Sequence, residues 1–262
     1  MTGEEQARPG LAPGVRRPVG TLFAALYGDL TPHPWRDPDA GQDAYFLFYH
    51  RCVAMGWLGE GALWGMNDAG QEHPLAAAEP PLASWFQVGV EPVRDGEPLP
   101  VQPFLRCAAD ATERIGRLRL RAAQVLLPVE ALDPGSRPPP SLIATGWFAA
   151  GDPGVRVPVR VTLDGGRAST VPAVAARLCA DLNGFDQSVF ACEAYSSTDH
   201  GLSIPPPFDD RLWNGPPEHR ATFDGTIAEW SADAIGALGA CLADLAARHG
   251  VTTPVLLTIR PE

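Results

Sequence analysis

The sequence contains no lysine, and all 20 of its basic residues are arginines. An arginine side chain keeps its proton under ordinary conditions and does not form an imine. Enzymes that need a lysine Schiff base, such as pyridoxal-phosphate enzymes and lysine-dependent aldolases, are therefore excluded. A Walker P-loop is excluded as well, because its phosphate site requires a lysine.

Other signatures are also missing. No apolar run approaches the roughly 20 residues of a transmembrane helix, and the polar N-terminus lacks the apolar core of a signal peptide. There is no G-x-G-x-x-G between a strand and a helix, no G-x-S-x-G and no H-E-x-x-H. The glycine-rich residues 59–65 have the wrong spacing and predict a turn. We expect no cofactor, no metal ion and no membrane association.

The five cysteines are widely spaced, and none of them belongs to a C-x-x-C pair. Their odd number and wide spacing argue against a disulfide framework and against a zinc–thiolate site. Cys179 and Cys241 fall on apolar helix stripes, where a buried thiol behaves as a small hydrophobic group. This usage is typical of a reducing compartment, so we expect a cytoplasmic location.

The net charge of −11 carries information about partners. Because no stretch of the chain is strongly basic, nucleic-acid binding is not expected; phosphate neutralisation supplies most of that affinity. An acidic surface would instead attract a basic protein partner by electrostatic steering.

The second half of the chain has the clearest secondary-structure pattern. Alternating apolar residues predict strands, and helix starts are indicated by Thr170 with Pro172 and by Ser231 as an N-cap. The expected elements are strand 155–163, a helix from 170 to 183, strands 188–195 and 221–230, a helix between Ser231 and His249, and strand 255–259. This β-α-β-β-α-β order is that of a ferredoxin-like unit.

The first half fits the same order with looser signals. Its expected elements are strand 19–27, helix 43–58, strands 62–66 and 85–93, helix 104–115 and strand 118–129. Residues 124–130 (QVLLPVE) resemble 254–262 (PVLLTIRPE). Residues 68–81 and 199–207 both contain an aspartate, a histidine and a proline run, although loops of a proline-rich chain can also look alike by composition.

The expected fold class is therefore α+β: tandem ferredoxin-like (βαββαβ) repeats with antiparallel sheets and helices on one face. We expect a disordered lead-in at 1–17, a first, divergent repeat at 18–132, a proline-rich linker at 133–146 and a second repeat at 147–262. At the level of architecture this layout resembles the dimeric α+β barrel group, which includes monooxygenases and haem proteins. No histidine in this chain fits a haem-ligand motif.

Two of the six histidines are candidates for chemistry. His73 and His200 each lie in the long loop between the second and third strands of their half, with Asp68 and Asp199 upstream. A neighbouring carboxylate can orient a histidine and raise its pKa, which suits general acid–base catalysis. The candidate catalytic residues are His200, Asp199 and Glu193.

The strand at 188–195 supplies further candidates. Alternation places Glu193 and Tyr195 on one face and Cys192 on the other. With Cys192 toward the helices, Glu193 and Tyr195 would face the open side of the sheet. The candidate binding residues are Tyr195, Trp213, His73 and Asp68.

Two functions remain open. The first is a small-molecule-binding protein or a cofactor-light enzyme of specialised metabolism, of cyclase, isomerase, dehydratase or monooxygenase type, with a pocket between two sheets. The second is a non-catalytic interaction factor, such as an immunity or accessory protein, that binds a protein partner through an acidic, Trp- and Pro-rich surface with Trp35, Trp85 and Trp213 as anchors. An enclosed cavity lined by His200, Glu193 and Tyr195 favours the first, and a filled core with exposed tryptophans favours the second. In either function we expect a monomer or a homodimer.

Overall fold

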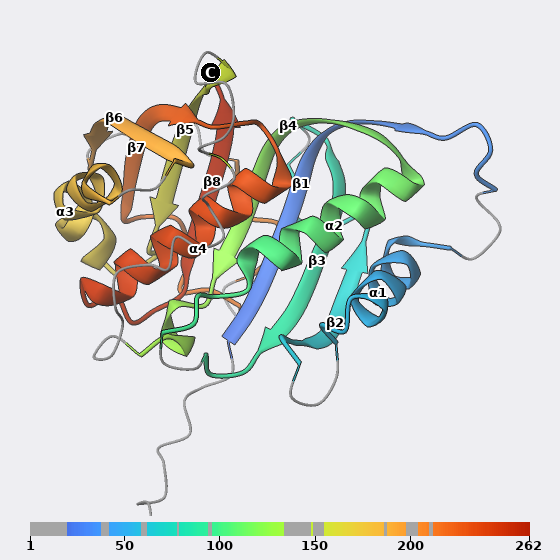
Figure 1. Ribbon diagram of the computed structural model, residues 1–262, viewed down its shortest axis with the longest axis horizontal. Helices are drawn as coiled ribbons and strands as arrows, with labels where there is room; N and C mark the ends of the chain where they lie inside the picture. The colour runs from blue at the N-terminus through green and yellow to red at the C-terminus, as the bar shows by residue number, and fades with distance from the viewer. Residues whose placement is uncertain are drawn as a thin grey trace, which may run out of the picture.

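The strands of both halves join one eight-stranded antiparallel sheet in the computed structural model, with the order β2-β3-β1-β4-β8-β5-β7-β6 (Figure 1). The structure describes residues 20–37, 42–58, 62–77, 79–93, 96–133, 148, 155–185, 188–197, 204–209 and 212–262. The expected lead-in lies outside these residues, as does the expected linker apart from Asp133.

Both halves run β-α-β-β-α-β, and the elements predicted for each are present in the predicted order. The first half consists of β1 (Gly20–Pro32), α1 (Ala44–Ala54), β2 (Gly65–Gly70), β3 (Leu82–Val90), α2 (Val101–Ile115), β4 (Gly116–Leu127) and the 3-10 turn η1 (Val129–Ala131). The second consists of β5 (Val157–Asp164), α3 (Thr170–Gly184), β6 (Phe190–Ser196), β7 (Arg220–Ile227), α4 (Ala232–Arg248) and β8 (Val255–Pro261).

The largest differences from the predicted bounds have local causes. Helix α1 was expected to reach residue 58, but it ends at Ala54 because Gly56 adopts a left-handed φ of 68°. Strand β1 continues to Pro32, well past its expected end, because β4 pairs with it as far as Gly116. The N-cap expected at Ser231 is formed, because its side chain accepts a hydrogen bond from Ala234 N (3.1 Å). The cap expected at Thr170 is not: Thr170 is the first residue of α3, and Ser169 before it makes no side-chain capping hydrogen bond. Asp43, which was not predicted as a cap, accepts a hydrogen bond from Phe46 N (2.8 Å) at the start of α1.

The two halves meet edge to edge through β4 and β8. These strands pair antiparallel from Ala123 opposite Ile259 to Leu127 opposite Val255. The fold is therefore α+β with the helices on one face, as predicted, but one continuous sheet replaces the expected pair of stacked sheets. The place expected for a pocket, between two sheets, is not formed by the described residues.

The helices cover one face of the sheet, and α2 and α4 lie side by side over the joint between the halves (Figure 1). Glycines in α4 permit the close approach. A Cβ added to Gly236 would lie 2.5 Å from the Cα of Gln102 in α2, and one added to Gly239 would meet Val101 at 3.1 Å. Within the described part of the chain, no helix has the length and hydropathy needed to cross a bilayer.

Gly236→Ala tests whether this close approach sets the stability of the joint. Alanine favours a helix over glycine by about 1 kcal/mol, but here the added methyl group overlaps backbone atoms of α2. We expect the free energy of unfolding to fall by about 1–3 kcal/mol, measured by urea denaturation. Gly184→Ala is the matched control, because nothing lies within 4 Å of its added Cβ. An equal gain in stability from both substitutions would contradict the packing argument.

Candidate functional site

The two long connections that the sequence singled out, β2–β3 and β6–β7, both reach the helix-free face of the sheet. A chain of aromatic rings joins them. The ring of His73 lies 5.3 Å from that of Trp85, and Trp85 stacks on Phe23 of β1 at 5.8 Å. Phe23 meets Phe208 at 5.0 Å, and Phe208 meets Trp213 at 6.2 Å. The two halves are thus linked across this face as well as through the sheet.

Gln124 of β4 fixes the β6–β7 connection in place. Its Nε2 donates to the carbonyl oxygen of Ile204 (2.6 Å) and lies 3.3 Å from Thr258 Oγ1, and its Oε1 accepts from the hydroxyl of Tyr27 (2.9 Å). Gln124 is fully buried, and burial raises the pKa of Tyr27. With Leu126 and Leu256 buried beside these groups, this part of the helix-free face is a filled core.

Trp213 belongs to that core and is not an exposed anchor. Only 3% of its surface is accessible. Its indole nitrogen is buried and finds no hydrogen-bond partner among the residues that the structure describes. Of the three tryptophans expected as anchors, Trp85 is half-buried and Trp35 is 71% exposed.

His73 and Asp68 lie close enough to interact electrostatically, but not in the way expected for a general base. Burial lowers the pKa of His73, and the charge of Asp68 only partly opposes that shift. His73 Nδ1 accepts a hydrogen bond from Leu75 N (3.3 Å), while the exposed Asp68 accepts from Ala69 N (2.8 Å). Burial therefore disfavours the protonated form of this histidine, whose ring packs against Trp85.

A β-bulge in β6 overturns the predicted alternation of its side chains. Cys192 pairs with Gly225, and Tyr195 pairs with Phe223, which lies in the helix-side core. The extra residue between Cys192 and Ala194 is Glu193, so Tyr195 shares the face of Cys192. Glu193 and Tyr195 are both exposed, but the structure does not bring them together on the open face. Asp199 and His200 lie outside the described residues.

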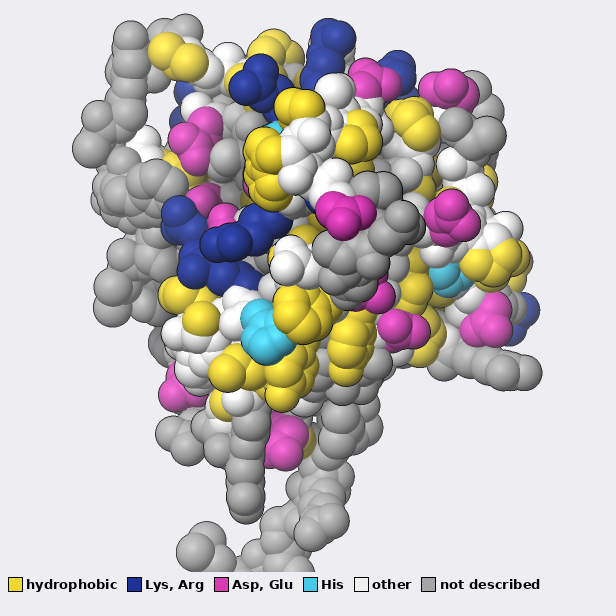
Figure 2. Space-filling view, turned by 90° about the vertical axis from the view of Figure 1, so that its right-hand side faces the viewer, with side chains coloured by type: hydrophobic (Ala, Val, Ile, Leu, Met, Phe, Trp, Pro, Cys, Tyr) yellow, Lys and Arg dark blue, Asp and Glu magenta, His cyan; other side chains and the backbone are white. Residues whose placement is uncertain are grey.

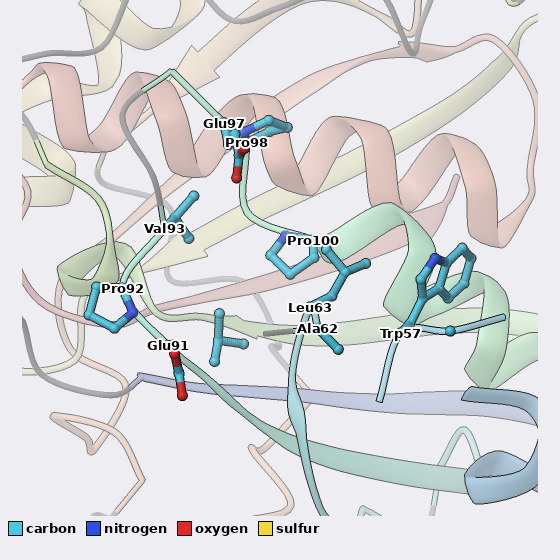
Figure 3. A pocket seen from close by; sticks show the side chains of 11 residues that line it. Trp57, Ala62, Leu63, Glu91, Pro92, Val93, Glu97, Pro98 and Pro100 are labelled. Atoms are coloured by element: carbon cyan, nitrogen blue, oxygen red, sulfur yellow. The ribbon is translucent and has the colours of Figure 1, made fainter. Parts of the chain in front are cut away.

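A groove of about 440 Å³ lies elsewhere, beside the end of α1. In Figure 3, Trp57 stands at one end of this groove and Glu91 at the other, with Leu63 and Pro100 between them. The groove has the volume of a small ligand site. Its other lining residues are Gly56, Ala62, Val90, Pro92, Val93, Glu97 and Pro98.

Backbone hydrogen bonds fix both sides of the groove. The amides of Leu63 and Trp64 donate to the carbonyl oxygen of Trp57, at 3.2 and 3.3 Å. On the other side, Val93 N donates to the carbonyl oxygen of Ala131 in η1 (3.1 Å). We did not predict this groove, because it is built from two connections. One sequence signal marks it: the Glu-Pro dipeptides at 91–92 and 97–98 both line it.

The helix that leads into the groove has an exposed aromatic face, which we call the α1 face: Tyr45, Phe46, Tyr49, His50 and Val53. The first three are 39–41% exposed and Val53 is 48% exposed. Phe46 packs on His50 with ring centroids 4.2 Å apart. On the side of the molecule seen in Figure 2, hydrophobic side chains gather at the surface next to a group of arginines.

Glu130 in η1 is a buried carboxyl that the sequence did not single out. Burial raises its pKa to about 7. Its Oε2 is buried, and within the described part of the chain it has no hydrogen-bond partner. Glu130 lies next to Ala131, whose carbonyl oxygen accepts the hydrogen bond from Val93 on the groove wall.

The described residues contain no cluster of three or more His, Cys, Asp or Glu side chains that could hold a metal ion. In comparisons with protein-family models, curated proteins and solved structures, no significant match to the chain was found.

Glu130→Gln is expected to change how stability depends on pH. Between the ordinary value of 4.5 and about 7, the unfolded chain releases a proton that the folded chain keeps. Wild-type stability therefore falls as pH rises through this window. The variant should be more stable than wild type by about 3 kcal/mol well above pH 7, and equal to it well below pH 4.5.

Thermal unfolding at a series of pH values checks this expectation. Glu72→Gln serves as the control because the side chain of Glu72 is exposed, so it should show no such pH-dependent difference. A constant difference between Glu130→Gln and wild type at every pH would mean that the carboxyl does not titrate in this window.

Proposed function

We propose that this protein is a non-catalytic interaction factor that binds an arginine-containing segment of a basic protein partner in the groove beside Trp57. The observation that carries the proposal is the composition of the groove: an aromatic ring, three prolines and two carboxylates, directly following the exposed α1 face. This groove would be part of the acidic, Trp- and Pro-rich surface expected for an immunity or accessory protein.

The charges support a cationic occupant. Glu91 and Glu97 both line the groove, and the chain as a whole carries a net charge of −11. A guanidinium group between these carboxylates would gain charge-assisted hydrogen bonds. At the other end of the groove, the indole of Trp57 offers a surface on which a second guanidinium group of the same segment can stack, worth about 0.5–2 kcal/mol. Long-range attraction by the net negative charge would speed the encounter with a basic partner.

The α1 face supports a partner larger than a small molecule. Its aromatic side chains are 39–41% exposed, although aromatic groups are usually among the most buried. Exposed apolar groups that cluster on one helix mark sites of protein–protein contact. Since α1 ends where the groove begins, one partner can cover both.

A small-molecule enzyme that acts through His200, Asp199 and Glu193 has less support. Asp199 and His200 lie outside the described residues, and Glu193 is not among the lining residues of the groove. The filled helix-free face and the exposed Trp35 support the interaction factor, although Trp213 is buried and Trp85 is half-buried.

We also propose that the two halves are tandem ferredoxin-like repeats produced by duplication. In support, each half has its fourth strand beside its first, in the orders β2-β3-β1-β4 and β8-β5-β7-β6. The similar segments QVLL (124–127) and VLL (255–257) are parts of the paired strands β4 and β8, where Leu126 lies opposite Leu256. The five cysteines are free thiols, which supports a location in a reducing compartment such as the cytoplasm.

The proposal is tested with a short synthetic peptide of alternating arginine and proline, because such a peptide is cationic and extended. Isothermal titration calorimetry should detect binding that weakens as salt is added. Replacing both groove carboxylates, Glu91→Gln with Glu97→Gln, should weaken binding about tenfold or more, which corresponds to roughly 1.4 kcal/mol.

A second double variant, Glu72→Gln with Glu113→Gln, changes the net charge equally at exposed positions that are not among the groove-lining residues. It should bind the peptide with nearly wild-type affinity. Equal loss of affinity in both double variants would reduce the interaction to general charge attraction, and absence of binding to wild type would refute the proposed occupant.

A further inference from the structure

Two thiols from different elements meet at the outer edge of the second half. Cys179 lies on α3 and Cys192 on β6, and their sulfur atoms are 2.8 Å apart. Sulfur atoms in a disulfide are separated by about 2.05 Å. Less than an ångström of movement therefore separates these free thiols from bonding distance.

The surrounding contacts hold the two cysteines in this position. The side chain of Asn183, one turn beyond Cys179 on α3, donates to the carbonyl oxygen of Cys192 (2.7 Å) and accepts from its amide (3.0 Å). Cys192 also begins the bulge of β6. Helix α3 is thus tied to β6 at the residue whose thiol faces Cys179.

We propose that Cys179 and Cys192 form a modification site at which a hydroperoxide oxidises the two thiols to an intramolecular disulfide. This site is separate from the groove, and the inference does not depend on the proposed function. Its oxidant class is the hydroperoxides, with hydrogen peroxide as the simplest member.

The reaction proceeds in two balanced steps. The thiolate of Cys179, the more accessible of the two, attacks one oxygen of hydrogen peroxide; an S–O bond forms, the O–O bond breaks, and hydroxide leaves. The sulfur of Cys192 then attacks the sulfenic sulfur, and an S–S bond replaces the S–O bond. The thiol proton and the leaving hydroxyl make water. The two sulfurs together lose two electrons, and the peroxide gains them.

The order of the steps follows from burial. Cys179 is half-buried, whereas Cys192 is 6% exposed and its thiol has a pKa raised chiefly by burial. Cys192 therefore remains a thiol until the adjacent sulfenic acid forms. A useful comparison exists in the first half, where Cys52 and Cys107 interact through their side chains but are both fully buried. An oxidant in solvent does not reach that pair while the protein is folded.

The experiment treats reduced, full-length protein with hydrogen peroxide and then alkylates the remaining thiols under denaturing conditions. Intact mass spectrometry should show the loss of two hydrogens and three alkylated cysteines out of five. No arginine lies between the two positions, so trypsin leaves both in residues 178–211; cleavage before Asp181 and Asp186 then yields two linked peptides. Oxidation should raise Tm by roughly 5 °C.

Cys179→Ser and Cys192→Ser should each abolish the two-hydrogen loss, while Cys241→Ser should leave it unchanged. Because the linkage is read in wild-type protein, the test does not depend on how the variants fold. Alkylation of both Cys179 and Cys192 after peroxide treatment would overturn the proposal. Conversion of Cys179 to sulfinic acid without a disulfide, or a linkage of Cys52 to Cys107 instead, would overturn it equally.

Discussion

The pairing of β4 with β8 is the contact on which the rest of the molecule depends. Each half taken alone would end in a strand with unpaired backbone groups, which is a site of aggregation unless it is covered. Five residues of each strand pair across the joint, from Ala123–Ile259 to Leu127–Val255. Both faces reinforce it: Gly239 of α4 packs over Leu257 and Leu127 on one side, and Gln124 bridges the strands and the β6–β7 connection on the other.

Because the joint uses β4 and β8, the strands left at the two edges of the sheet are β2 and β6. The groove and the Cys179–Cys192 thiol pair both lie near these edges. The groove is formed by the connections that flank β2 and β3, and the thiol pair lies between β6 and α3. The centre of the sheet is covered by helices on one face and by aromatic side chains on the other, which leaves the periphery for recognition.

Much of this fold could be predicted from sequence, because each strand and helix buries one face and so carries the period of its element. Ala221–Ile227 and the α4 stripe are examples, and Ser231 caps α4 as its residue type indicates. The pairing of β4 with β8 could not be predicted, because the side-chain periodicity of a strand does not show which other strand it pairs with. The predicted faces of Glu193 and Tyr195 were wrong because β6 has a bulge at Glu193, and no sequence pattern indicated that bulge. The groove was missed because connections have no period at all.

The histidines and tryptophans of the proline-rich β2–β3 and β6–β7 connections suggested a functional site. In the structure, the described parts of these connections cover the sheet. A sheet with helices on one face still needs its other face covered, and the described parts of these connections do this with Phe208, Trp213 and Ile204. The apolar residues in the described parts of these connections are therefore explained by burial of the sheet, and burial lowers the pKa of His73. Once these side chains are assigned to the core, the aromatic groups still exposed are mainly those of α1. The proposed recognition of a basic partner rests on these exposed groups, on the groove with two carboxylates beside them and on the negative net charge.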